Sequence, residues 1–552
     1  MLRTRKFALV VSVLALAGML LTACGPKQPA GGAAQGGTAP AKTSGKPAVG
    51  GEVTIRLPKD PDSLNPILSS SSYGSDIYSL VYDGLFEFNE KWEPVPSLAE
   101  SYSVTPDGLT WTIPLKKGVK FQNGDEFTAE DVVFTLSSVM DKDYTGPRSS
   151  NVSAIKEIKA TDKYTVTITL KEPYAPLLED ISLGIMDHNY MKGVTVKDMD
   201  KHESAFKPMG TGPYKFVEYK RGQYVTLERN ENWFNSQANG GAPFIKTVKY
   251  KIIPEDATAE ASLENGEIDV LHTPDPKDVS RLEKDFAGKV STVNYERNGW
   301  GYITFNVTRP NLSDKRVRQA LTLGLDRQSI IDGLMDGRGV IPGGPIPPVS
   351  WAADSSIKPA PYDPAGAKKL LEQAGYKMGA NGIYEKDGQP LKITFYGSSG
   401  SALIEGIASV ARKNWKEIGV DTDVQLMDYN ALLDNYMKPG KFDVTFSGMS
   451  LSLDPDQSGL FHSSAVNGFN RGRYASPKVD QLLEQGVKET DPAKRKAIYS
   501  EYQKTFVDDA PVIFVYANKY TDAVSTKVKG VVNFPGSGAT ISYLYKWYVN
   551  EQ

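Results

Sequence analysis

The sequence has almost no cysteine. Cys24 is the only cysteine among 552 residues, so no disulfide can form within the chain. A chain of this length also exceeds the roughly 250 to 300 residues at which a single hydrophobic core usually stops growing. We therefore expect at least two domains, each stabilised by a large core of its own.

The chain also lacks the short motifs of common enzyme classes. No GxxxxGK[ST], HExxH, GxSxG or CxxC pattern occurs, which argues against a phosphate-binding loop, a zinc protease helix and a nucleophile elbow. The four histidines are scattered along the sequence, at His188, His202, His272 and His462. The sequence therefore predicts no catalytic residue, no metal site and no cofactor, and an enzyme is the remotest hypothesis.

Neither sign of charge dominates. The formal net charge is −3, and 23% of the residues are charged and 40% hydrophobic. This composition is ordinary for a soluble protein and carries no nucleic-acid signature. Electrostatics alone therefore names no partner.

Residues 448–459, GMSLSLDPDQSG, contain an acidic run that resembles the start of a calcium-binding loop. With Asp454 at position one, position twelve is Ala465, where such a loop needs a bidentate glutamate. A run that begins at Asp141 fails in the same way, because Val152 occupies its twelfth position. The sequence thus argues against calcium at both places.

The N-terminus is organised as a secretory signal. Basic residues within the first six precede an uncharged, mostly apolar run from Phe7 to Ala23, the order found in signal peptides. The run ends in LTAC, which resembles the lipobox of bacterial lipoproteins, where the cysteine is lipidated and becomes the first mature residue. We expect residues 1–23 to be the signal peptide and Cys24 to be lipidated. The alternatives are an uncleaved anchor or a chance cysteine.

Residues 24–50 are expected to form a flexible linker behind the lipid. Between Gly25 and Gly50 there are seven Gly, four Pro and six Ala, a composition that cannot bury a core. Such a linker would let a globular body move above the membrane.

From Gly51 onward the sequence predicts a mixed α/β protein, because strand-like runs are interleaved with amphipathic helical segments. Helices are predicted after Asp363 and Asp491, each followed by proline, and after Thr128, which forms a capping box with Asp131. The predicted strands include 53–57, 164–170, 224–228, 302–307, 391–396 and 512–516.

Residues 115–132, LKKGVKFQNGDEFTAEDV, resemble the signature of the bacterial extracellular solute-binding proteins of family 5, the oligopeptide and dipeptide receptors of ABC importers. Each further motif is weak alone, but together they match the family in order along residues 51–552. They are DSLNP (62–66), YDGL (82–85), PSLAES (96–101), GTGPY (210–214), GEID (266–269), DKRVRQAL (314–321), DR (326–327), YDP (362–364) and EQAGY (372–376).

The resemblance implies an α/β fold of the two-lobed periplasmic-binding-protein type II (Venus-flytrap), with a ligand cleft between the lobes and an extra subdomain in lobe one. The strands predicted at 302–307 and 512–516 are expected to cross the hinge. The expected limits are 51–301 for lobe one, with an inserted subdomain at about 90–205, then 302–511 for lobe two and 512–552 for the return to lobe one.

The resemblance also implies function. We expect a monomeric lipoprotein, held at the outer face of the cell membrane or on its periplasmic side, that captures oligopeptides and delivers them to an ABC permease driven by a separate ATPase. The resemblance implies that an extended peptide adds as a strand to two edges of the protein. The ligand-binding residues expected there are Ser70, Ser71, Ser72 and Tyr73 at one edge and Ser447, Gly448, Met449, Ser450 and Leu451 at the other.

The sequence departs from the family at one informative place. Many relatives carry a Trp-x-x-Asp-x-x-Asp-Pro pattern whose first aspartate binds the peptide ammonium, but here Gly448 and Leu451 replace the tryptophan and that aspartate. A buried ammonium without a carboxylate would cost several kcal/mol. This favours longer or differently anchored peptides, as in the Gram-positive oligopeptide-binding members. Oligosaccharides, nickel or haem chelates and a role as a peptide-signal sensor remain alternatives.

Overall fold

The structure is a computed structural model that describes residues 47–552 apart from 90–91, 275, 533–540 and 550–552. The predicted signal peptide, Cys24 and residues 25–46 of the predicted linker lie outside the described residues. Within the part that is described, no helix is long and apolar enough to span a bilayer.

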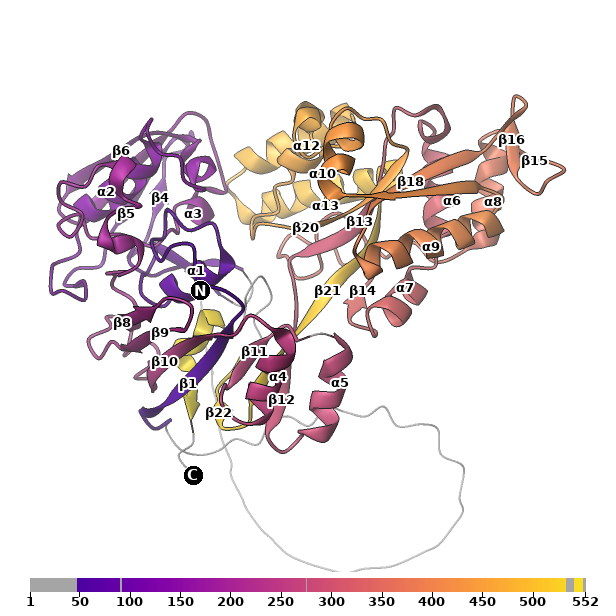
Figure 1. Ribbon diagram of the computed structural model, residues 1–552. Helices are drawn as coiled ribbons and strands as arrows, with labels where there is room; N and C mark the ends of the chain where they lie inside the picture. The colour runs from indigo at the N-terminus through magenta and orange to yellow at the C-terminus, as the bar shows by residue number, and fades with distance from the viewer. Residues whose placement is uncertain (1–46, 90–91, 275, 533–540, 550–552) are drawn as a thin grey trace, which may run out of the picture. The chain divides into compact units, whose positions relative to one another are not determined.

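Twelve strands form one mixed sheet (Figure 1). In sheet order they are β19 (Asp421–Met427), β18 (Lys392–Ser398), β20 (Val444–Ser450), β13 (Gly299–Phe305), β21 (Val512–Ser525), β11 (Val270–His272), β1 (Gly50–Leu57), β10 (Ile245–Ile252), β9 (Tyr224–Arg229) and β8 (Tyr214–Lys220), with β12 (Val290–Glu296) and β14 (Gly339–Val340) also paired to β21. The beginning of β21, Val512–Tyr516, pairs with β13, and its end, Lys519–Ser525, pairs with β12. This one strand therefore connects the two halves of the sheet.

The half of the sheet that contains β1 shares one large hydrophobic cluster with a separate four-stranded sheet. The smaller sheet falls within the predicted insertion at about 90–205. The elements of this part are α1 (Ser72–Tyr78), β2 (Phe86–Phe88), β3 (Pro94–Pro96), β4 (Ser103–Val104), β5 (Thr110–Pro114), α2 (Ala129–Met140), β6 (Ile155–Asp162), β7 (Thr165–Leu170), α3 (Leu177–Asp180), α4 (Asp256–Glu264), α5 (Pro276–Asp285), β22 (Val528–Lys529) and β23 (Tyr548–Val549).

The other half, built on β13, β18 and β20, has two clusters of its own. One lies beneath α6 to α9, and the second is rich in aromatic residues and packs α12 and α13 against β13. The elements are α6 (Lys315–Leu323), α7 (Arg327–Leu334), α8 (Pro364–Gln373), β15 (Lys377–Met378), β16 (Tyr384–Lys386), β17 (Gln389–Pro390), α9 (Ala402–Glu417), α10 (Tyr429–Leu432), α11 (Ser458–Phe461), α12 (Pro477–Lys488) and α13 (Pro492–Asp509). Separate cores agree with the expectation from chain length.

The helix starts predicted from local motifs are confirmed. Asp363 and Asp491 cap α8 and α13 with their side chains, and proline follows each cap. Thr128 and Asp131 form the reciprocal capping box of α2. These contacts depend only on neighbouring residues, so the sequence was sufficient to predict them.

The strand predicted at 302–307 is wrong at both ends, since β13 begins at Gly299 and ends at Phe305. The two glycines at its start allow very close packing. A Cβ on Gly299 would lie 2.2 Å from the Met449 carbonyl oxygen, and one on Gly301 would lie 2.4 Å from the Tyr516 ring. Glycine usually breaks a strand, but here it permits close approach of a neighbouring backbone and ring.

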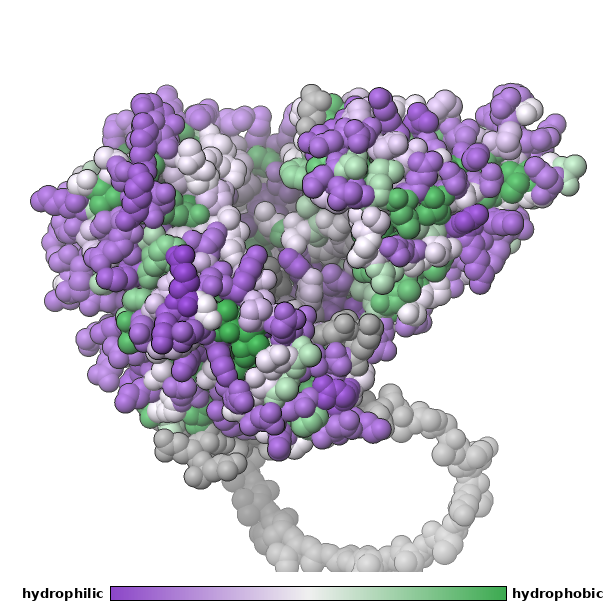
Figure 2. All heavy atoms as spheres, viewed as in Figure 1, coloured by the Kyte–Doolittle hydropathy of each residue, from purple (hydrophilic) through white to green (hydrophobic). Residues whose placement is uncertain are grey.

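Hydrophilic residues cover most of the face shown in Figure 2. The large hydrophobic side chains that are exposed include Val217, Tyr362 and Phe469. Single exposed residues of this kind are normal for a globular protein.

Candidate ligand-binding site

Strand β20 has one edge that is only partly covered. Its whole length pairs with β13, from Val444 to Ser450. On its other side β18 pairs with it only at Val444 and Thr445. Among the described strands, none pairs with the rest of that edge. The predicted ligand-binding residues at 447–450 lie on this open part.

The direction in which the backbone N–H groups of β20 point follows from its hydrogen-bond ladder with β13. The Asn306 N–H donates to the Asp443 oxygen and the Leu451 N–H to the Asn298 oxygen, both at 2.9 Å. Because bonded pairs alternate along an antiparallel ladder, the N–H groups of Gly448 and Ser450 point to the open edge. Both residues are exposed. A Cβ on Gly448 would meet no atom within 4 Å, so the face of the sheet toward which this Cβ would point is also uncovered at this residue.

The other segment predicted to contact the ligand begins at Ser70, whose position is fixed by hydrogen bonds to Asp62. Oδ2 of Asp62 accepts hydrogen bonds from the Ser70 N–H at 2.8 Å and the Ser70 hydroxyl at 2.9 Å. Burial alone would raise the pKa of Asp62, but hydrogen bonds from Ser69 and Ser70 outweigh burial and hold the pKa below its usual value. The DSLNP motif thus holds this loop through an ionised carboxylate.

The chain after Ser70 is not an extended edge, in contrast to the expectation that strand-type pairing would occur there. The Ser71 hydroxyl accepts the Tyr73 N–H at 3.1 Å, so α1 begins at Ser72. A serine run can cap a helix as readily as it forms a loop, and the sequence did not reveal which. The four residues stay candidates for ligand contact through side chains, with the Tyr73 ring lying 5.4 Å from the Lys59 ammonium.

Sequence reasoning missed Arg148 beside this loop. Its guanidinium donates to the Tyr78 hydroxyl at 3.0 Å and to the Ser69 oxygen at 3.4 Å. Within the described part of the chain no carboxylate forms an ion pair with it, and its Nε has no hydrogen-bond partner. Arg148 therefore offers positive charge next to the predicted contact, although nothing near position 148 in the sequence signalled this.

Leu451 contributes no charge to the open edge, as the sequence indicated. Its carbonyl oxygen accepts a hydrogen bond from Asn298 at 3.3 Å. Its half-buried side chain packs against the aromatic cluster that includes Trp300 and Phe461. The position that the resemblance aligns with an ammonium-binding aspartate is thus apolar and turned toward the core.

The acidic residues once considered for calcium are occupied by protein partners. Asp454 binds the two terminal nitrogens of Arg495 at 2.6 and 2.8 Å. Oδ1 of Asp456 accepts the Ser458 N–H at 3.0 Å and the Ser458 hydroxyl at 2.6 Å. The stretch after β20 is a hydrogen-bonded turn.

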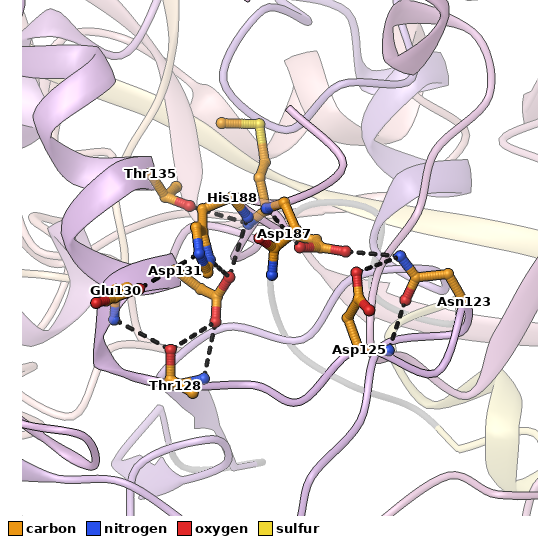
Figure 3. A network of polar contacts seen from close by, with 10 residues as sticks. Asn123, Asp125, Thr128, Glu130, Asp131, Thr135, Asp187 and His188 are labelled. Atoms are coloured by element: carbon orange, nitrogen blue, oxygen red, sulfur yellow. Dashed lines mark hydrogen bonds and ion pairs between the residues drawn. The ribbon is translucent and has the colours of Figure 1, made fainter. Parts of the chain in front are cut away.

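One group of possible metal ligands, Asp131, Asp187 and His188, lies at the start of α2 (Figure 3). Asp131 Oδ1 lies 2.7 Å from the ring Nδ1 of His188 and accepts the backbone N–H of His188 at 3.0 Å, while Oδ2 accepts the Thr128 N–H at 2.7 Å. Asp187 accepts a hydrogen bond from Asn123 at 2.7 Å. These ligand atoms already have protein partners, so we interpret the group as a structural network that ties the signature segment to residue 188.

Comparison with known proteins places the chain in a family. Residues 93–470 match the profile of the bacterial extracellular solute-binding proteins, family 5 (middle region). The chain is 32% identical over 546 residues to the oligopeptide-binding protein AppA of Bacillus subtilis, covering 97% of each chain. The structure of AppA from Bacillus subtilis in complex with a nonapeptide matches with a TM-score of 0.69 and 32% identity, over 92% of this chain and 100% of that one.

A second solved structure is also similar to this chain. CtaP, an ABC transporter substrate-binding protein from Listeria monocytogenes, matches with a TM-score of 0.78 and 30% identity, over 91% of this chain and 100% of that one. These neighbours have the two-lobed type II periplasmic-binding fold, which confirms the predicted fold class. The family's role is binding and not catalysis. The chain belongs to the bacterial extracellular solute-binding proteins of family 5.

Proposed function

We propose that this chain is the substrate-binding lipoprotein of an ABC importer and that it captures oligopeptides between two lobes. The observation that carries the proposal is the open edge of β20, where the N–H groups of Gly448 and Ser450 face away from β13. An extended peptide can add to such an edge by main-chain hydrogen bonds that do not depend on its sequence. Relatives named for oligopeptide binding support the same conclusion.

The change of pairing partner along β21 indicates where the lobes meet. The limits expected from the sequence fall inside β13 and at the first residue of β21. Because β21 changes partner from β13 to β12 between Tyr516 and Lys519, we assign lobe one to residues 51–297 and 518–552, and lobe two to 298–517. The hinge then consists of β21 and of the link between β12 and β13.

Ligand binding would close the two lobes. A ligand that touches both lobes stabilises the closed arrangement by its differential affinity for that arrangement. The permease would then recognise the closed, loaded form. Import energy would come from a separate ATPase, since the chain has no phosphate-binding loop.

Calorimetry tests the ligand class. Protein purified from cells is first examined by native mass spectrometry for a retained ligand, then titrated with peptides of increasing length and with cello- and manno-oligosaccharides. We expect binding of peptides and no binding of sugars. Stabilisation by sugars alone would overturn the peptide assignment, and turnover of peptides or glycosides would overturn the non-enzymatic role.

We further propose that Cys24 carries a lipid that holds the monomeric protein at the outer face of the membrane. Metabolic labelling with a fatty acid should mark the wild-type chain and not Cys24→Ser, and the variant should be released into the medium or periplasm. Retention of the variant in the membrane would instead indicate an uncleaved apolar anchor.

A further inference from the structure

A cavity of about 730 Å³ lies between the two lobes, beside the loop that follows β20. Its lobe-one wall comes from the β2–β3 hairpin, β4, β5 and the start of α3, and its lobe-two wall from the start of α13 and the loop after β20. Residues 447–451 do not line it, but Leu453 and Asp454 do. The cavity therefore begins two residues beyond Leu451, where the predicted ligand edge ends.

Five of the residues that line this cavity are aromatic. Tyr102 stacks on Trp111, with ring centroids 5.6 Å apart and an interplanar angle of 24°, yet 44% of Tyr102 remains exposed. One face of its ring is thus covered while much of the residue is open. The aromatic lining residues are Phe88, Trp92, Tyr102, Trp111 and Trp351.

Apart from the Glu179 carboxylate, the charged groups at the cavity are balanced in sign. Glu179 accepts the N–H groups of Leu453 and Asp454, and the Asp454 carboxylate binds Arg495. At the exposed positions, Lys496 and Glu93 carry opposite charges. The lining therefore favours a flat, uncharged group over an ion of either sign.

We propose that this cavity is a subsite for an aromatic side chain, carried by the end of a peptide that extends past Leu451. The proposal rests on the proposed function and deepens it. Because Leu451 has no carboxylate to bind the peptide ammonium, a peptide does not have to end at this position. A ligand on the β20 edge is therefore free to continue toward Leu453. A ring that enters the cavity gains offset or edge-to-face contacts with Tyr102 and its neighbours.

A double-mutant cycle tests the subsite. Wild type and Tyr102→Ala are titrated with peptides that carry tryptophan or alanine at the first position, and with a second pair that differs at the last position. Aromatic contacts of this kind change affinity by about threefold to tenfold. We expect wild type to prefer tryptophan by this factor at one end only, Tyr102→Ala to lose the preference, and the alanine peptides to bind both proteins alike.

Tyr362→Ala is the matched control, because Tyr362 is similarly exposed, at 41%, and does not line the cavity. It should keep the tryptophan preference. If Tyr102→Ala weakens the binding of the tryptophan and alanine peptides equally, or changes the binding of neither, the subsite is overturned and the proposal of peptide binding still stands. Cello-oligosaccharides that bind wild type and lose affinity in Tyr102→Ala would assign the cavity to sugars instead. If no peptide binds wild type, the proposed function fails and the subsite with it.

Discussion

Glu179 and Asp454 lie 275 residues apart in the sequence and are joined by a hydrogen bond of 2.6 Å from the Asp454 N–H to Oε2 of Glu179. The other carboxylate oxygen of Glu179 accepts the Leu453 N–H at 3.0 Å. Arg495 neutralises the side chain of Asp454, whereas in the described part of the chain the Glu179 carboxylate has these two N–H donors and no ion pair. The contact joins the two proposed lobes beside the ligand edge.

This contact should depend on pH. Burial raises the pKa of Glu179 to about 7, with the negative charge of Asp454 as a second cause. When the two segments separate, the carboxyl is exposed and its pKa returns to the usual value of 4.5. At pH values between these two pKa values, the state in which Glu179 contacts Leu453 and Asp454 binds more protons than the state in which they are separated. The contact therefore loses stability as the pH rises, by up to about 1.4 kcal/mol per pH unit.

Spin labels at Thr161→Cys and Lys478→Cys, in a Cys24→Ser background, would report the separation of the lobes by pulsed electron resonance. We expect a larger joined fraction at pH 5 than at pH 8. Glu179→Gln should reduce this dependence, and Asp180→Asn should remove a further part of it, because burial also raises the pKa of Asp180 to about 7. An unchanged pH profile in Glu179→Gln would contradict the assignment.

The open edge of β20 predicts different effects of proline at two neighbouring positions. Gly448→Pro removes an N–H that points to the open edge, so it should weaken peptide binding by about fivefold and leave the fold in place. Met449→Pro removes an N–H from the ladder with β13 and should lower the free energy of unfolding by about 3 kcal/mol. Calorimetry and thermal unfolding separate the two effects. Equal binding by Gly448→Pro and wild type would show that the edge does not bind ligand backbone.

The elements that sequence predicted well depend on local chemistry. The caps at Asp363 and Asp491 need only a side-chain oxygen, a following proline and a backbone N–H two or three residues further on. Resemblance to the family likewise depended on short motifs. In both cases the information lies within a few neighbouring residues, so no tertiary contact had to be known.

The features that sequence missed depend on distant partners. The open edge of β20 exists because β18 stops pairing after Thr445, and no pattern within either strand indicates where the two diverge. Ser71 was predicted to lie on an extended edge but caps α1. The capping box identified the bond of Asp131 to Thr128 but not its contact with His188, 57 residues further on. Each outcome was decided by a residue outside the local motif.

Leu451→Asp tests the missing anchor. The half-buried leucine packs against the aromatic cluster, so the aspartate should lower the free energy of unfolding by about 1 to 3 kcal/mol. If the alignment of this position with the ammonium-binding aspartate holds, peptides with free N-termini should bind about tenfold more tightly, while N-acetylated peptides should not. Leu451→Asn is the uncharged control. An equal change for free and acetylated peptides would refute the alignment.

Asp131→Asn distinguishes a structural network from a metal site. Asp131 is fully buried, and both of its oxygens accept hydrogen bonds, from Thr128 and from His188. An amide cannot accept at both ends, so the variant should lose about 1 to 3 kcal/mol of unfolding free energy. Glu130→Gln, at an exposed neighbouring position, should change stability by less than about 0.5 kcal/mol. Zinc should raise the melting temperature of neither variant nor of wild type. A rise in wild type that Asp131→Asn abolishes would instead identify a metal site.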